Sequence, residues 1–256
     1  MWTLIILAID VIILYMIVPF VTTRILGWGV VSRGNAAKEV AFTFDDGPDP
    51  CYTPQVLDLL KEHDVKATFF VLGKKAEQFP DLIQRMHREG HQIGIHNYTH
   101  TSNWCYLPWT NRRKQVDRTA DIVKRITGER PIFYRPPWGL LNLGDLVLIR
   151  RSYRIVLWSV MVGDWKASVS AAQLKHDLLK KIKPGSIIVL HDNGDTPGAD
   201  REAPLNMVTG LEEVLKEIPR RGLKGLRVDE LLDKEAGSIG EAQSRANVTV
   251  RSTRSY

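Results

Sequence analysis

The stretch VAFTFDDGPDP, residues Val40 to Pro50, places two adjacent acids directly after a run of apolar and β-branched residues. The run predicts a buried strand, and the Gly-Pro that follows predicts a turn at its carboxyl end. Two carboxylates this close repel each other, and burying an unpaired one costs several kcal/mol or shifts its pKa. Something in the folded protein must therefore stabilise Asp45 and Asp46.

Short apolar runs alternate with amphipathic stretches along the rest of the chain. The stretches repeat apolar residues at three and four positions, as helices do, so the alternation predicts parallel strands joined by crossover helices. Seven strand candidates exceed the needs of a small open sheet. We therefore expect an α/β fold, a distorted or incomplete (β/α) barrel of about seven parallel strands. The candidates are VAFTF, ATFFVLG, QIGIH, IFYRPP, RIVLWSV, SIIVLH and GLKGLRV.

The composition is that of a globular protein, with 44% hydrophobic and 25% charged residues in a chain of 256. The net charge of +6 and the pI near 9.3 suit an anionic polymer or a membrane surface as partner. No dense block of Lys and Arg indicates nucleic-acid binding. Cys51 and Cys105 form no CxxC pair, so we expect neither a zinc finger nor a disulfide framework, and we interpret both cysteines as incidental.

Residues 2 to 22 are long and apolar enough to span a bilayer, apart from the acid Asp10. A central Asp costs about 2.5 to 3.5 kcal/mol, whereas the surrounding Leu, Ile, Val and Phe side chains together return about 4 to 8 kcal/mol. A cleaved signal peptide is the alternative, but no basic region precedes the run and no small-x-small site follows it. A buried helix of the soluble domain is the other alternative. We expect a retained, single-pass transmembrane anchor.

The chain then divides into an anchor at residues 1–23, a linker at 24–38, a catalytic domain at 39–232 and a disordered tail at 233–256. Arg24, Arg33 and Lys38 follow the anchor, and by the positive-inside rule they would place the domain in the cytoplasm. A polymer substrate requires the opposite side. Because the rule weakens for long domains, we expect an extracytoplasmic domain in a monomeric membrane protein.

Polar residues follow five of the predicted strands, where a barrel carries its chemistry. The stretch HNYTH supplies two imidazoles, and on a helical turn this spacing puts both on one face. Two His and one carboxylate, with open positions for water and substrate, match a catalytic divalent-metal site. A metal could take one carboxylate as ligand and leave the other to act as a base. The strand-end residues are Asp45, Asp46, His96, His100, Arg135, Asp164, Trp165, His191 and Asp192.

The motifs TFDDGP, HNYTH, RPPWG, DW and VLH, in this order, resemble the signature motifs of the polysaccharide deacetylase family, the NodB-homology domains of carbohydrate esterase family 4. The resemblance covers residues 39 to 232. It implies a metal-dependent hydrolase on a distorted (β/α) barrel that removes N-acetyl, and sometimes O-acetyl, groups from sugar polymers.

The resemblance also implies roles for individual residues. Asp46, His96 and His100 would bind the metal, most often zinc, although cobalt, nickel or manganese are alternatives. Asp45 would be the general base, oriented by Arg135. His191 would be the general acid that protonates the departing amine, with Asp164 as its partner. The backbone N–H of Trp138 would bind the oxyanion, and the substrate-binding residues would be Pro137, Trp138, Trp165, Val189 and Leu190.

The chain departs from the family pattern at several positions. The fourth motif, WSVMVGDW, lacks acids that relatives commonly carry near Ser159 and Met161. Asn97 replaces a usual Ser or Thr, Trp138 a usual Tyr, and Val189 a usual Leu. The first departure weakens the expected support of Arg135 and His191, and the last two affect the substrate groove.

We therefore expect a membrane-anchored enzyme that removes N-acetyl groups from a cell-envelope polysaccharide, such as the N-acetylglucosamine units of peptidoglycan or a chitin-like glycan, and releases acetate. A carbohydrate-binding membrane protein with weak catalysis is one alternative. A metal amidase or O-acetyl esterase acting on another substrate is a further one. Neither the net positive charge nor the membrane anchor distinguishes one acetylated glycan from another as the substrate.

Overall fold

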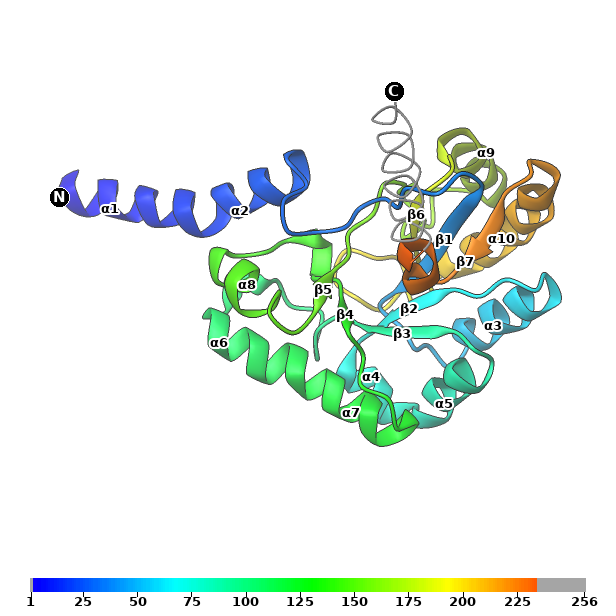
Figure 1. Cartoon of the computed structure of the whole chain (residues 1–256), viewed down its shortest axis with the longest axis horizontal. Helices are drawn as coiled ribbons and strands as arrows, with labels where there is room; N and C mark the ends of the chain where they lie inside the picture. Colours follow the sequence, from blue (N-terminus) through cyan, green and yellow to red (C-terminus); the bar gives the residue numbers. More distant parts are fainter. Residues whose placement is uncertain (1, 234–256) are drawn as a thin grey trace, which may run out of the picture.

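The structure of the protein, a computed structural model, describes residues 2–233 (Figure 1). Its seven strands form one parallel sheet in the order β5-β4-β3-β2-β1-β6, and β7 pairs with β1. The curled sheet confirms the predicted incomplete barrel and all seven strand candidates. The strands are β1 (Glu39–Asp45), β2 (Thr68–Val71), β3 (Gln92–Ile95), β4 (Phe133–Tyr134), β5 (Arg154–Ile155), β6 (Ile187–His191) and β7 (Lys224–Leu226).

Helices cover the convex side of the sheet, as crossover connections between parallel strands require (Figure 1). The amphipathic stretches predicted to be helices correspond to α3, α5, η4 with α7, α9 and α10, whose bounds are given below. Three short helices lack the length to show a clear period and have no predicted counterpart. The helices of the domain are α3 (Tyr52–Glu62), α4 (Gly73–Gln78), α5 (Pro80–Arg88), α6 (Pro108–Asn111), the π-helical η4 (Arg112–Asp117), α7 (Arg118–Thr127), α8 (Leu143–Leu148), α9 (Ala171–Lys181) and α10 (Ala203–Arg220), with 3₁₀ turns η3 (Asn103–Cys105) and η5 (Pro137–Gly139).

Strand β1 pairs with β2, β6 and β7, and the alternation of its side chains decides where its acid points. Phe42 and Phe44 face the helices and belong to the main hydrophobic core, where Phe44 stacks on Phe69 with ring centroids 5.0 Å apart. Successive side chains of a strand point to opposite faces. Thr43 and Asp45 therefore face the concave interior of the barrel.

The segment 24–38, predicted as a linker, is bound along the edge of the barrel. The Val31 N–H donates to Ile155 O at 2.8 Å, and the Leu157 N–H donates to Val31 O at 2.7 Å. Gly34 donates to Gly185 O at 2.8 Å, and a Cβ at Gly185 (φ +79°) would lie 2.0 Å from the Gly34 oxygen. The segment 24–38 therefore packs against the domain along this edge.

A continuous helix precedes this segment and projects from the domain (Figure 1). It runs through α1 (Trp2–Ile12), η1 (Ile13–Ile17), α2 (Val18–Phe20) and η2 (Val21–Ile25). Its apolar stretch Ile5–Ile25 has 21 residues and a mean hydropathy of 2.6, so it is long and apolar enough to cross a membrane. A signal sequence passes the same test. The predicted disordered tail lies, from residue 234 on, outside the described residues.

Candidate active site at the carboxyl ends of the strands

A cavity of about 210 Å³ opens at the carboxyl ends of β1, β3 and β6. It brings together most of the polar residues that the sequence places at strand ends. This is the end of a parallel α/β barrel at which loops collect functional groups. Its lining residues are Arg24, Asp45, Asp46, His96, His100, Trp138, Trp158, Met161, Trp165, Val189, His191 and the segment 196–199.

Asp46, His96 and His100 form the one cluster of metal-ligating side chains in the described part of the chain, with ligand atoms within 4.8 Å of one another. The Nε2 atoms of His96 and His100 each lie 3.3 Å from Asp46 Oδ1. Thr196 donates its hydroxyl hydrogen to the other carboxylate oxygen, Oδ2, at 2.6 Å. The predicted ligand set is thus assembled, with one carboxylate oxygen left for a metal.

The hydrogen bonding around His96 shows that these residues fit a cation. His96 Nδ1 lies 2.7 Å from the Arg135 carbonyl oxygen, which only accepts, so Nδ1 carries the hydrogen. Its Nε2 then presents a lone pair toward Asp46 Oδ1, which is buried and has no hydrogen-bond donor among the described residues. Two acceptors that face each other in a buried site are satisfied by a positive ion between them.

The charge state of the cluster also suits a metal. Burial alone would raise the pKa of Asp46, but the neighbouring imidazoles of His96, His100 and His191 lower it well below its usual value. Burial lowers the pKa of His100 to about 4, despite the opposing effect of Asp46. At neutral pH, Asp46 is therefore a carboxylate and His100 is neutral, which are the protonation states that metal ligands need.

Arg135 holds Asp45 in a buried ion pair. Its Nη1 donates to Asp45 Oδ1 and to Thr43 Oγ1, both at 2.7 Å. Nε donates to the Val156 carbonyl at 3.2 Å, and Nη2 donates to the Leu157 carbonyl at 3.0 Å. The predicted pairing is present, and every arm of the guanidinium is used.

His191 and Asp164 form a second charged pair at the same cavity. The His191 backbone N–H donates to Asp164 Oδ2 at 2.6 Å, and Nδ1 lies 3.2 Å from the same oxygen. Burial lowers the pKa of the imidazole, but the attraction of Asp164 outweighs it and raises the pKa to about 10. His191 is therefore an imidazolium at neutral pH, the form that donates a proton.

Three residues around the cluster have left-handed backbone conformations, which are uncommon outside glycine. They are Asp46 (φ 75°), Asn97 (φ 66°) and Trp138 (φ 53°). Asn adopts such a φ more readily than Ser or Thr, which gives a physical reason for Asn at position 97, directly after His96. Backbone strain of this kind is concentrated at functional sites.

Two tryptophans of the predicted substrate groove each contact a histidine of the site. The Trp138 ring lies 4.2 Å from the His100 ring, and the Trp165 ring meets the His191 ring edge-on at 5.5 Å. Gly139 and Leu140 use their N–H groups within the turn, whereas the Trp138 N–H has no protein acceptor within residues 2–233. That N–H remains available for an oxyanion.

Two predicted substrate-binding residues do not line the cavity. Val189 lines it, but the next residue of β6, Leu190, points to the opposite face and is buried in the main core. Pro137 is buried inside the 3₁₀ turn η5 and also lies outside the lining. Leu190 and Pro137 are therefore corrected from groove residues to packing residues.

Comparison with known proteins matches residues 32–150 to the family described as Polysaccharide deacetylase. A peptidoglycan-N-acetylglucosamine deacetylase of Bacillus cereus is 40% identical over 187 residues, which cover 73% of this chain and 65% of that protein. A second one from the same organism is 36% identical over 77% of this chain and 90% of its own length. The chain belongs to the polysaccharide deacetylase family.

A solved structure supports the same assignment. The crystal structure of the Bc1960 peptidoglycan N-acetylglucosamine deacetylase superposes with a TM-score of 0.74 at 35% identity, covering 82% of this chain and 96% of that one. The fold of this polysaccharide deacetylase thus agrees with the one inferred from its sequence.

Seven residues that line the deacetylase cavity were not predicted from the sequence: Arg24, Trp158, Met161 and the segment 196–199. Arg24 comes from the end of the N-terminal helix, stacks on Trp158 at 4.1 Å and approaches the Trp138 carbonyl at 3.4 Å. Met161 also lines the cavity. Thr196 follows the strand-end His191 by five residues on one loop, and this short spacing is the only sequence signal for it.

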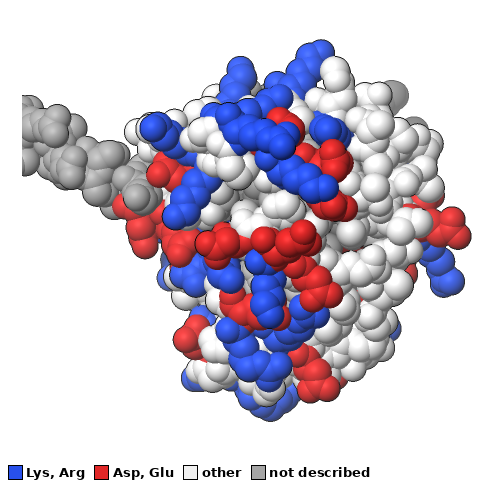
Figure 2. Space-filling model, turned by 90° about the vertical axis from the view of Figure 1, so that its right-hand side faces the viewer, with Lys and Arg blue, Asp and Glu red and all other residues white. Residues whose placement is uncertain are grey.

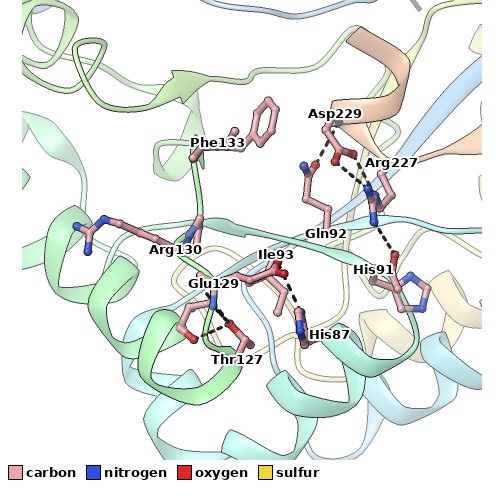
Figure 3. Close-up of a pocket in the computed structure, with 14 residues that line it drawn as sticks. His87, His91, Gln92, Ile93, Thr127, Glu129, Arg130, Phe133, Arg227 and Asp229 are labelled. Carbon is pink, nitrogen blue, oxygen red and sulfur yellow. Dashed lines mark hydrogen bonds and ion pairs between the residues drawn. The ribbon is translucent and has the colours of Figure 1, made fainter. Parts of the chain in front are cut away.

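A second cavity, of about 350 Å³, lies near the opposite ends of the strands, beside the amino ends of β3 and β4 (Figure 3). Several of its polar groups contact one another: Arg227 lies 2.9 Å from Asp229 and 3.2 Å from Gly90 O, and His87 lies 4.0 Å from Glu129. It contains no ligand cluster within the described residues. The larger cavity is therefore not the candidate active site of this deacetylase.

Proposed function

We propose that the protein is a metal-dependent deacetylase that removes N-acetyl groups from N-acetylglucosamine units of peptidoglycan and releases acetate and a free amino sugar. The observation that carries the proposal is the assembly of one ligand cluster and two charged pairs, Asp45–Arg135 and His191–Asp164, at one cavity. The named activities of the two Bacillus cereus relatives supply the substrate class.

Asp46, His96 and His100 would hold the metal, and zinc best suits two imidazoles and one carboxylate with open positions. The bound ion would act as a Lewis acid that polarises the amide carbonyl and lowers the pKa of water. Asp45, paired with and oriented by Arg135, takes a proton from the attacking water.

The other residues act on the carbonyl oxygen and on the leaving nitrogen of the amide. The Trp138 N–H stabilises the negative charge on the carbonyl oxygen as the tetrahedral carbon forms. His191 then gives its proton to the amide nitrogen, so the C–N bond breaks to acetic acid and a neutral amine. Asp164 keeps His191 protonated until that step. Water supplies one oxygen of the acetic acid. One proton of that water is then on Asp45, the other is on the acetic acid, and the proton from His191 is on the amine.

The location of this reaction is also part of the proposal. We place the helix as a single-pass membrane anchor with the deacetylase domain on the extracytoplasmic side, where peptidoglycan lies. Digestion by an added protease on intact cells tests this arrangement. Full protection of the domain would contradict it.

Acetate release from peptidoglycan and from N-acetylglucosamine oligomers, with added zinc or cobalt, tests the proposed activity. An Asp45→Asn variant is the control because it keeps the volume of the side chain and removes the base. We expect release by the wild-type protein and loss of about 10²- to 10⁴-fold in the variant. No release from any acetylated glycan by the metal-loaded protein would refute the proposal.

A further inference from the structure

Four large apolar side chains are exposed on the domain beside the N-terminal helix. They lie on two segments in direct contact, since a Cβ at Gly144 of α8 would lie 2.1 Å from Pro108 Cγ of α6. We call these four residues the helix-side patch. They are Leu107, Trp109, Leu143 and Val147, which are 58%, 64%, 43% and 50% exposed.

The helix itself packs along this part of the domain. The Tyr15 hydroxyl donates to the Tyr106 carbonyl, one residue before the patch begins. Pro19 and Thr23 are buried, and α8 lies directly beside α2 in Figure 1. The second half of the helix is therefore lined on one side by the patch-bearing segments.

The length of the helix decides how deep the patch lies. The helix rises about 1.5 Å per residue, so residues 2 to 14, which precede the domain contact, extend only about 20 Å. The hydrocarbon core of a bilayer is about 30 Å thick. A helix that spans it must bring roughly 10 Å of its domain-packed part into the bilayer, and the surface at that level enters with it.

The charge around the patch agrees with this depth. Residues 98–113 and 138–151, which carry it, contain a single acid, Asp145, and that side chain is fully buried. Arginines flank the patch, and Arg150 stacks on the exposed Trp28 at 4.7 Å, a pairing suited to a lipid headgroup layer. The domain face opposite the helix instead mixes Lys and Arg with Asp and Glu (Figure 2).

We infer that the helix-side patch is immersed in the outer part of the bilayer, so that the domain is embedded at its helix side instead of being tethered at a distance. This inference rests on the proposed membrane anchor. Because Arg24 lies in the last turn of the helix and also lines the active cavity, the site is held at the lipid surface. The glycan it reaches is then one that lies against the membrane.

Spin labels on the full chain test the inference. Cys51 and Cys105, both exposed and free, are replaced by Ser, and single nitroxides are placed through Leu107→Cys and Val147→Cys. Ile9→Cys reports on the helix, and Leu205→Cys on α10, 54% exposed, is the matched aqueous control. The proteins are reconstituted in vesicles of phosphatidylcholine and phosphatidylglycerol at a ratio of about 3:1, which gives the membrane a negative surface charge.

The readout is the accessibility of each label to oxygen, which partitions into lipid, relative to a water-soluble nickel complex. We expect oxygen to dominate at positions 107, 147 and 9, and the nickel complex to dominate at 205. Water-like values at 107 and 147 beside a lipid-like value at 9 overturn the inference and leave the anchor intact. Shielding of 107 and 147 from both reagents, as in a protein contact, overturns it too.

Water-like values at all four positions overturn both the inference and the anchor on which it rests. The labels report depth and not turnover, so absence of acetate release in the activity assay is a separate result. The circular dichroism spectrum of each labelled protein is compared with that of the unlabelled chain. We expect the labelled proteins to keep their fold, because all four replaced side chains are exposed.

Discussion

Asp45 and Asp46 are adjacent, buried and stabilised by different partners. Asp45 faces Arg135 at 2.7 Å, whereas Asp46 faces two imidazoles and Thr196. The pair is therefore stable because its two members do not share one environment. Arg135 neutralises one carboxylate, and the proposed metal would neutralise the other.

Exchanging each acid for its amide separates these roles. Asp46→Asn should abolish zinc binding, because it removes the only anionic ligand of the cluster. Asp45→Asn should keep zinc and lose activity by about 10²- to 10⁴-fold, since the base contributes about that much. Zinc content after gel filtration, measured by mass spectrometry, and acetate release together check the result. Equal loss of zinc in both variants would show that the roles are misassigned.

The pH profile depends on the pair His191–Asp164. Burial lowers the pKa of His191 and Asp164 raises it to about 10, so removing the Asp164 charge must lower it. Asp164→Asn keeps an oxygen that can accept a hydrogen bond from His191, but without the negative charge the His191 imidazolium loses its proton at lower pH. We expect the alkaline limb of kcat/KM to move to lower pH in this variant.

Asp81→Asn is the control for this shift, because it removes the same charge from an exposed position on α5. Its profile should match that of the wild-type protein. An alkaline limb that stays in place in Asp164→Asn would mean that another group is the acid.

At the scale of elements, Arg135 connects parts of the sheet that are not neighbours. It follows β4, pairs with Asp45 of β1, donates to two carbonyls that follow β5, and lies 4.1 Å over the Phe70 ring of β2. Strands β1 and β4 are separated by β2 and β3 in the sheet. The guanidinium therefore ties the concave interior of the barrel together.

Arg135→Met should destabilise the fold because it leaves Asp45 buried without its partner. Breaking a buried pair costs about 3 to 5 kcal/mol. For a domain of this size, that lowers Tm by roughly 6 to 20 °C. Thermal unfolding of the full chain in detergent measures it. Arg154→Met is the matched control on the exposed side of β5, and a similar loss in both variants would refute the special role of Arg135.

Most of the barrel and the site could be predicted from the sequence because they depend on local patterns. Strand runs, HxxxH spacing and acids at strand ends are visible without tertiary contacts. The error at Leu190 was avoidable, since alternation along β6 puts Val189 and His191 on one face and Leu190 on the other. Arg24 and Trp158 were not predictable, because their contact depends on how the segment 24–38 packs along the barrel edge.

At the scale of the whole molecule, Arg24 couples the N-terminal helix to the cavity and adds a positive charge to its wall. Peptidoglycan fragments that keep their peptide carboxylates should be attracted to it, whereas neutral N-acetylglucosamine oligomers should not. At roughly 8 Å and an effective dielectric constant of about 20 to 80, one charge pair contributes about 0.5 to 2 kcal/mol. Arg24→Leu should therefore lower kcat/KM about 2- to 30-fold for the charged fragments and leave the neutral oligomers nearly unchanged.

Arg33→Leu is the control for this effect, because Arg33 donates to the Pro184 carbonyl and does not line the cavity. It removes the same net charge from the segment that follows the helix, so it separates a local effect from a change in total charge. Initial rates on both substrates, at low and high salt, measure the difference. Screening should reduce the effect of Arg24→Leu as salt increases, because the cavity is open to solvent. An equal loss on charged and neutral substrates would mean that Arg24 shapes the cavity through its stacking on Trp158 and not through its charge.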